Sequence, residues 1–350
     1  MACSRSWRYS FSRHRILLLN SFVFEVKTIC IQPEITVYRK ESAVTEVRIV
    51  ADYGDLCGEC PLWSPETKDL FWVDCLGLRF YRLDWERGVH SLLKQGFEIK
   101  GFAFNRGGGF VITNSAGIWL WDGSQNPRLL ISEVEGNKCQ MNDCIADPRG
   151  RLLAGTCFYD PQAKYPLGKL VTVESDGKAR ILDDGFHMAN GLGFSPDGRT
   201  LYFTDSAVRR IYAYDYNLSE GKVSNRRVFV ELSDNAGLPD GLTVDTDGFV
   251  WSAEWYGSRV VRYDPSGKFE REIRTPAKQT SSLTFGGYDL TDIFITSAAL
   301  SGPLSLIPRG YDPSSGSSGG ALYHVSFDIR GKAEFKADIR TDLETASNVK

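Results

Sequence analysis

Hydrophobic and polar residues alternate along most of the chain after residue 45, in short runs separated by turn residues. The clearest instance covers residues 190–205, where an apolar run, a Ser-Pro-Asp-Gly turn and a second alternating run follow one another. Pro196 sets φ at its turn position, and Gly198 supplies the left-handed residue that closes the turn. Alternation at period two indicates strands buried on one face, and sustained helical periodicity is hard to find in this region. The pattern therefore predicts an all-β fold.

The same strand–turn–strand unit recurs along the chain. The repeats align on the start of their first strands, at Glu59, Lys100, Asn142, Asn190, Asp240 and Ser281. These positions are spaced by 41, 42, 48, 50 and 41 residues, and in most copies a third and a fourth strand follow. Four-stranded units at this period are typical of a β-propeller, whose blades stack radially around a central channel. We therefore expect a six-bladed β-propeller in which the six aligned residues converge on the channel.

All six aligned residues are polar, although the repeats are otherwise rich in apolar residues. Glu59 and Asp240 offer carboxylates, and Asn142 and Asn190 offer amide carbonyls, which are the oxygen ligands that hard divalent cations prefer. Asn and Asp at the start of a strand also commonly hydrogen-bond their own turns, which is the structural alternative. Because four oxygen donors stand in register in four copies, we predict a divalent metal site in the central channel.

Several motifs, in their order along the chain, resemble one family. They are Gly58-Glu-Cys-Pro-Leu-Trp63, Asn190-Gly-Leu with Ser195-Pro-Asp-Gly198, Tyr202-Phe-Thr-Asp-Ser206 and Pro239-Asp-Gly-Leu242. The chain is similar to the family of senescence marker protein (regucalcin), gluconolactonase and luciferin-regenerating enzyme, from about residue 47 to about residue 330. The resemblance implies a six-bladed propeller with one divalent metal ion (calcium, zinc, magnesium or manganese) in the channel, and commonly hydrolysis of a lactone.

The resemblance also assigns roles to individual positions. Glu59, Asn190 and Asp240 match the family's metal ligands, and Asn142 matches a residue that contacts the substrate near the metal. The family's substrate-contacting Arg, two places before that Asn, is Gln140 in this chain. A further acidic substrate contact is expected at about Asp160, within a segment that departs from the family pattern. These two departures leave the metal ligands in place and put specificity for sugar lactones in doubt.

The predicted activity is a metal-dependent hydrolysis of a small-molecule lactone, gluconolactonase-like or of a related cyclic ester. The metal would polarise the lactone carbonyl and activate water, Asp240 would be both ligand and general base, and Asn142 would help to hold the developing oxyanion. A divalent-metal or calcium-binding regulatory protein without significant turnover is the alternative.

A propeller that serves as a platform for protein interactions would have apolar or basic ring residues, which is not the pattern seen. Lys100 is the exception, and it is either a wall residue or a contact for an anionic group of the substrate.

Composition narrows the picture further. The 350 residues carry a net charge of −3 with acids and bases well mixed, so nothing favours nucleic acid as a partner, and no obligate protein partner is evident. Among the eight cysteines, Cys57 and Cys60 form a C-x-x-C pair without the second pair that a zinc site needs. We expect free thiols and a reducing compartment.

Residues 1–45 differ from the remainder, which we assign to the propeller (46–350). They are basic, contain several serines and have no acid before Glu25, and the apolar run 16–19 is too short to span a membrane. We interpret them as an unstructured or targeting leader. The expected location is cytoplasmic, with a mitochondrial or secreted protein as the alternative if the leader is a targeting segment.

Overall fold

The computed structural model describes residues 46–124, 126–158, 168–302, 304–312, 314, 316–317, 319–340 and 342, together with the short segments 17–19 and 22–24. The chain divides into two units, Met1–Val44 and Thr45–Lys350. In the first unit β1 (Leu17–Leu19) pairs antiparallel with β2 (Phe22–Phe24), and the other residues of the predicted leader lie outside the described residues. No helix in the described ranges is long and apolar enough to cross a membrane.

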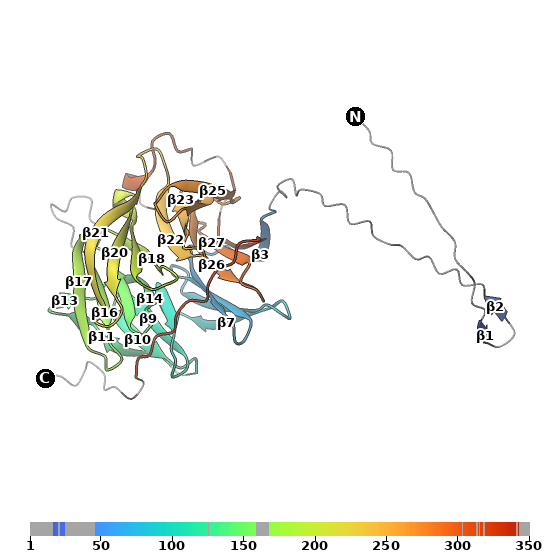
Figure 1. The fold of residues 1–350 in the computed structure, drawn as a ribbon, viewed down its shortest axis with the longest axis horizontal. Helices are drawn as coiled ribbons and strands as arrows, with labels where there is room; N and C mark the ends of the chain where they lie inside the picture. Colours follow the sequence, from blue (N-terminus) through green and yellow to red (C-terminus); the bar gives the residue numbers. More distant parts are fainter. Residues whose placement is uncertain are drawn as a thin grey trace. The chain divides into compact units, whose positions relative to one another are not determined.

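The second unit is a six-bladed β-propeller, as predicted (Figure 1). In the part of the chain that the structure describes, six antiparallel four-stranded sheets form blades 1 to 6. Blade 1 contains β4 (Gly58–Ser64), β5 (Asp69–Asp74), β6 (Arg79–Asp84) and β7 (Val89–Gln95). Blade 2 contains β8 (Gly101–Phe104), β9 (Phe110–Asn114), β10 (Gly117–Trp121) and β11 (Arg128–Ile131). Blade 3 contains β14 (Met141–Ala146), β15 (Leu152–Thr156), β16 (Gly168–Val173) and β17 (Ala179–Phe186).

The remaining blades repeat this order. Blade 4 contains β18 (Ala189–Phe194), β19 (Thr200–Asp205), β20 (Arg210–Asn217) and β21 (Lys222–Glu231). Blade 5 contains β22 (Leu238–Val244), β23 (Val250–Trp255), β24 (Arg259–Tyr263) and β25 (Phe269–Arg274). Blade 6 contains β26 (Thr280–Gly286), β27 (Asp292–Ser297), β28 (Ala321–Ser326) and β3 (Arg48–Asp52). Short elements outside the blades are β12 (Glu133–Val134), β13 (Asn137–Lys138) and the 3-10 turns η1 (Ser206–Val208) and η2 (Leu304–Leu306).

The predicted turn at residues 195–198 is confirmed. Gly198 has a φ of 68°, and its amide donates to the carbonyl of Ser195 at 2.8 Å. The amide of Ser195 in turn bonds the carbonyl of Thr200 at 3.0 Å, which starts the pairing of β18 with β19. The repeat motif therefore forms the hairpin between the two innermost strands of a blade.

Blade 6 is closed by the beginning of the propeller unit rather than by its end. The outermost strand β3 pairs antiparallel with β28, with Ala321 opposite Asp52 and Leu322 opposite Ala51. The repeat pattern does not predict this pairing. Because the chain passes from β3 into β4 of blade 1, this pairing links blade 6 to blade 1 through the main chain.

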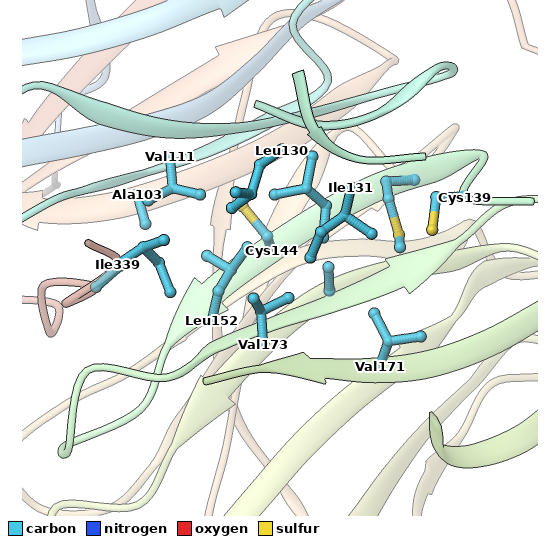
Figure 2. Packing of buried hydrophobic residues seen from close by; sticks show 14 of the residues in the cluster. Ala103, Val111, Leu130, Ile131, Cys139, Cys144, Leu152, Val171, Val173 and Ile339 are labelled. Atoms are coloured by element: carbon cyan, nitrogen blue, oxygen red, sulfur yellow. The ribbon is translucent and has the colours of Figure 1, made fainter. Parts of the chain in front are cut away.

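The blades pack on one another through apolar faces. Figure 2 shows the cluster between blades 2 and 3, where Val111 and Leu130 face Leu152 and Val173 across the interface. These side chains are fully or almost fully buried. Ile339, which comes from the C-terminal segment, packs in the same cluster. The alternating apolar positions of the sequence thus face neighbouring blades, as sheets that cannot bury their faces alone require.

The C-terminal segment closes one end of the channel. After blade 6 it runs past blade 5, where the carbonyl of Arg330 accepts a hydrogen bond from the amide of Thr246 at 3.0 Å. It then reaches blade 2, where the amide of Ala337 donates to the carbonyl of Phe104 at 2.8 Å. Between these points Phe335 lines a small cavity together with innermost-strand residues of all six blades: Leu62, Phe102, Ile145, Leu192, Leu242 and Leu283. Thr243 also donates to the Glu334 carboxylate at 2.9 Å. The candidate site lies in a second cavity, which shares the wall residues Cys60 and Asp143 with the first.

Candidate active site in the channel

The innermost strands are irregular where the aligned polar residues stand. Five of the six described innermost strands change register there: β4 after Glu59, β14 after Met141, β18 after Asn190, β22 after Pro239 and β26 after Thr280. A bulge of this kind adds a residue to one strand and redirects the side chains beside it. The repeat thus interrupts the regular pleat at the channel wall, and consecutive residues can face the same space.

Five of the six aligned residues line one cavity of about 260 Å³: Glu59, Lys100, Asn142, Asn190 and Asp240. Ser281 does not line it. Its side chain is fully buried, and its hydroxyl donates to the carbonyl of Gly58 at 2.5 Å, which ties blade 6 to blade 1. The structure therefore brings together all four of the oxygen donors singled out in the sequence and gives Ser281 a structural contact.

The two ring carboxyl groups have no ion-pair partner in the described structure. Asp240 is only 4% exposed, and its Oδ1 is buried without a hydrogen-bond partner in the described structure. Glu59 is half-buried because one side faces the cavity, and its Oε2 accepts a bond from the amide of Cys60 at 3.2 Å. Burial, followed by the charge of Asp240, raises the pKa of Glu59 well above its ordinary value. Burial and the charge of Asp143 do the same to the pKa of Asp240.

The two ring amides are held in one hydrogen-bond chain. The Asn190 amide nitrogen donates to the Ser206 hydroxyl at 2.9 Å, and this hydroxyl donates to the carbonyl of Pro239 at 2.7 Å. These bonds direct the oxygen of Asn190 to the other side, where it accepts a 2.8 Å bond from Asn142. The second hydrogen of the Asn142 amide bonds the carbonyl of Ala189 at 2.8 Å. Donation from Asn142 to an oxyanion would therefore require one of these bonds to open, and its oxygen is the atom left for a ligand.

Asp143 lines the cavity although the repeat pattern does not predict it. Alternation predicts that it faces away from the channel, but the bulge in β14 places it in the cavity beside Asn142. Burial raises the pKa of Asp143 to about 6, although the amide of Cys144 donates to its carboxylate at 2.7 Å and the Cys60 thiol lies 3.6 Å from it. Its position directly after an aligned asparagine was the available signal.

Cysteines form part of the same wall. Cys57, Cys60 and Cys75 line the cavity as free thiols, which confirms the expectation for the C-x-x-C pair. Cys60 has a φ of 48°, and its thiol donates to the carbonyl of Lys100 at 3.0 Å. Burial is the largest cause that raises the pKa of the Cys60 thiol well above its ordinary value. The thiol is therefore neutral.

The outer part of the cavity differs from the ring in character. Trp255, Leu76 and Leu300 line it, and the two leucines are 53% and 45% exposed. Gln140, a predicted substrate contact, is exposed and is not among the residues described around the cavity. Asp160, the second predicted substrate contact, lies outside the described residues. The structure thus does not bring Gln140 to the ring.

Asp205 acts on the cavity indirectly. It is buried, and its carboxylate accepts bonds from the backbone amides of His187 and Met188, both at 3.0 Å. Met188 lines the cavity beside Asn190. The carboxylate of Asp205 therefore orders the segment that leads into β18, as a residue that organises the channel mouth would do.

The donor set suits a hard divalent cation. No group of three or more His, Cys, Asp or Glu side chains in the described ranges is arranged to hold a metal, and the predicted set in fact contains two carboxylates and an amide. Isolated carboxylates removed from water are unfavourable unless a cation or hydrogen bonds accompany them. A divalent cation would satisfy this requirement here. It would bind the unpartnered Oδ1 of Asp240, the Glu59 carboxylate and the oriented oxygen of Asn190.

Comparison with known proteins decides the family. Residues 57–299 match the family model described as the SMP-30/gluconolactonase/LRE-like region. The chain belongs to this family. A pentonolactonase, XacC of Haloferax volcanii, is 35% identical to it over 301 residues, which cover 85% of this chain and 99% of the relative.

Solved structures of the SMP-30/gluconolactonase/LRE-like family agree with the fold. A luciferin-regenerating enzyme superposes with a TM-score of 0.73 at 25% identity, covering 84% of this chain and 100% of the other. A regucalcin from Agrobacterium tumefaciens, described as a calcium-binding protein, gives a TM-score of 0.72 at 25% identity, covering 85% and 98%. The predicted family and fold are thereby confirmed.

Proposed function

We propose that this protein is a metal-dependent hydrolase that opens a sugar lactone or a related cyclic ester with water. The observation that carries the proposal is the pair of ring carboxylates, Glu59 and Asp240, which share one cavity without a cationic partner among the described residues. The relative from Haloferax volcanii is named a pentonolactonase, which supports a lactone as the substrate.

Glu59, Asn190 and Asp240 would hold the metal. When bound there, a divalent cation would polarise the lactone carbonyl and lower the pKa of a water molecule. The chain itself prepares this site, because the Ser206 hydroxyl accepts the amide nitrogen of Asn190 and so turns the amide oxygen toward Asn142, which lines the same cavity. Calcium, zinc, magnesium and manganese all accept such oxygen ligands.

Asp240 would also move the proton. Its Oδ1 has no donor in the described chain, so it can accept a proton from the attacking water as a general base. The proton is then available for the ring oxygen of the lactone when the acyl–oxygen bond breaks. Asn142 would orient the substrate through its amide oxygen, since both hydrogens of that amide are engaged.

A divalent-metal-binding protein without significant turnover is the second candidate. Gln140 replaces a basic substrate contact and lies at the surface, so a neutral sugar lactone would lose that contact. The Agrobacterium relative is described only as a calcium-binding protein. This candidate predicts the same metal affinity and no hydrolysis.

The deciding experiment measures hydrolysis of a panel of sugar γ- and δ-lactones by the chelated protein, before and after Ca²⁺, Zn²⁺, Mg²⁺ and Mn²⁺ are added in turn. We expect at least one metal to restore turnover and Asp240→Asn to lower it by about 100-fold or more. Asp176→Asn, at an exposed turn, is the matched control and should leave the rate unchanged. Metal binding without turnover on every lactone would favour the second candidate instead.

A further inference from the structure

We propose that Lys100 determines substrate specificity by binding an anionic group of the lactone, at a point away from the carbonyl that is attacked. This inference rests on the proposed function, and it narrows the substrate class to lactones that carry a carboxylate, sulfonate or phosphate.

Lys100 comes from a blade that contributes none of the predicted metal ligands. The predicted ligands come from blades 1, 4 and 5, through Glu59, Asn190 and Asp240. Lys100 and Asn142 come from blades 2 and 3, which lie between blades 1 and 4, and blade 2 is opposite blade 5 in the ring. A lactone whose carbonyl lies over the ligands would therefore extend its remaining substituents toward Lys100 and Asn142.

Lys100 is the only basic residue described around the cavity. Its sole ion pair in the described structure joins Nζ to the Glu98 carboxylate at 3.9 Å, which is long for such a contact. Glu98 is also committed elsewhere, because it accepts bonds from the amide and the hydroxyl of Ser115 at 2.9 and 3.1 Å. The ammonium of Lys100 is therefore only weakly engaged by its own protein.

The backbone of Lys100 is fixed while its side chain is left available. Its amide donates to the carbonyl of Thr113 at 2.9 Å, and its carbonyl accepts the Cys60 thiol at 3.0 Å. The side chain retains 23% of its exposure, so the charge stands at the cavity wall and is not buried against a carboxylate. A flexible stem that carries a point charge suits an anionic group whose position varies modestly between substrates.

The charge of the cavity makes this role necessary for an anionic substrate. Glu59, Asp143 and Asp240 all line the space and would repel a second negative group. A divalent cation offsets only the carboxylates that bind it. Lys100 supplies a positive charge that no metal ligand offsets. Because the cavity wall is partly desolvated, a single charge pair there has a large effect on binding.

The test compares lactones that differ by one charge: neutral D-glucono-1,5-lactone, D-glucaro-1,4-lactone with a carboxylate, and 6-phospho-D-glucono-1,5-lactone with a phosphate. The metal-loaded full-length chain is assayed as wild type, Lys100→Met and Lys100→Arg. Lys94→Met is the matched control, since Lys94 bonds Asn126 outside the cavity and loses the same charge. Thermal unfolding checks that each variant is folded.

We expect the wild type to prefer at least one anionic lactone, and Lys100→Met to raise its KM by about tenfold or more. KM for the neutral lactone should change by less than about twofold, and Lys100→Arg and Lys94→Met should keep the preference. Added salt should weaken the preference of the wild type for the anionic lactone. The ratio of the two KM values in Lys100→Met should not depend on salt. Equal loss on neutral and anionic lactones, or a wild type that prefers the neutral one, overturns the proposal.

A binding measurement separates this proposal from the proposed function. Calorimetry of the wild type and of Lys100→Met with D-gluconate and D-glucarate requires no turnover. Tighter binding of glucarate that disappears in Lys100→Met supports the role of Lys100 even if no lactone is hydrolysed. Equal binding of the two acids by both proteins contradicts it.

Discussion

The side-chain amide of Asn142 donates a 2.8 Å hydrogen bond to the amide oxygen of Asn190, across the seam between blades 3 and 4. A predicted substrate contact thus supports a predicted metal ligand. Outer residues of this kind commonly change metal affinity when they are removed, because they orient the ligand.

Asn142→Ala should therefore weaken metal binding by about tenfold as well as impair hydrolysis. Without its donor, the oxygen of Asn190 is held only through the bond from its own nitrogen to Ser206. Titration calorimetry with the metal that best restores activity measures the effect. Asn126→Ala, at an exposed contact with Lys94, serves as the control. Unchanged metal affinity in Asn142→Ala would show that the bond does not support the metal ligand.

The fold and most of the ring could be predicted because their signals are local and repeated. Period-two alternation, a turn motif and a polar residue at each strand start recur in register, so Glu59 and Asp240 could be placed together although 181 positions separate them in the sequence. The bulges carry no comparable signal. For this reason Asp143, which alternation directs away from the channel, was missed.

Contacts between segments that are far apart in the sequence could not be predicted from the repeat pattern either. The pairing of β3 with β28 joins strands more than 250 positions apart, and nothing in a five-residue strand specifies its partner. Ser281 fits the aligned position by sequence, yet its hydroxyl bonds the carbonyl of Gly58 on the next blade. Whether a ring residue faces the cavity or its neighbour depends on packing that only the assembled blades define.

Metal binding should release protons, and metal affinity should fall as pH is lowered. The pKa values of Glu59 and Asp240 lie above their ordinary values in the folded chain without metal, so a metal must displace protons from them. Calorimetry in buffers with different ionisation enthalpies measures the number released. A binding enthalpy that does not depend on the buffer would contradict the assigned ligands.

The same shifts predict how stability depends on pH once the metal is chelated. A carboxyl with a raised pKa binds more protons in the folded state than in the unfolded state, so its contribution to the free energy of unfolding falls as pH rises above its ordinary value. For Asp240 that value is 3.8. Denaturant unfolding between pH 5 and pH 8 should therefore show a smaller loss of stability in Asp240→Asn than in the wild type. Identical pH profiles would exclude a raised pKa at this site.

The plug formed by the C-terminal segment should contribute to stability and not to metal binding. Ile339 is 2% exposed, and both its amide and its carbonyl bond the side chain of Asn105 at 2.9 Å. Ile339→Ala would leave a cavity between blades 2 and 3 and should lower the free energy of unfolding by about 2–5 kcal/mol. Leu92→Ala, at a position that is 48% exposed, should cost far less. A marked loss of metal affinity in Ile339→Ala would show that the plug supports the site.

The spacing between blades 5 and 6 should control Asp240 through the residue that follows it. Gly241 has no side chain, and a Cβ there would overlap the hydroxyl of Ser282 and lie 2.8 Å from its Cα. Gly241→Ala should therefore push β22 away from β26, displace the Asp240 carboxylate and weaken metal binding together with activity. Because the two nearest atoms belong to the Ser282 side chain, Ser282→Gly should restore part of the loss in the double variant, which a double-mutant cycle measures as a coupling between the two sites. Strictly additive effects would mean that Gly241→Ala acts through its own backbone and not through contact with the neighbouring blade.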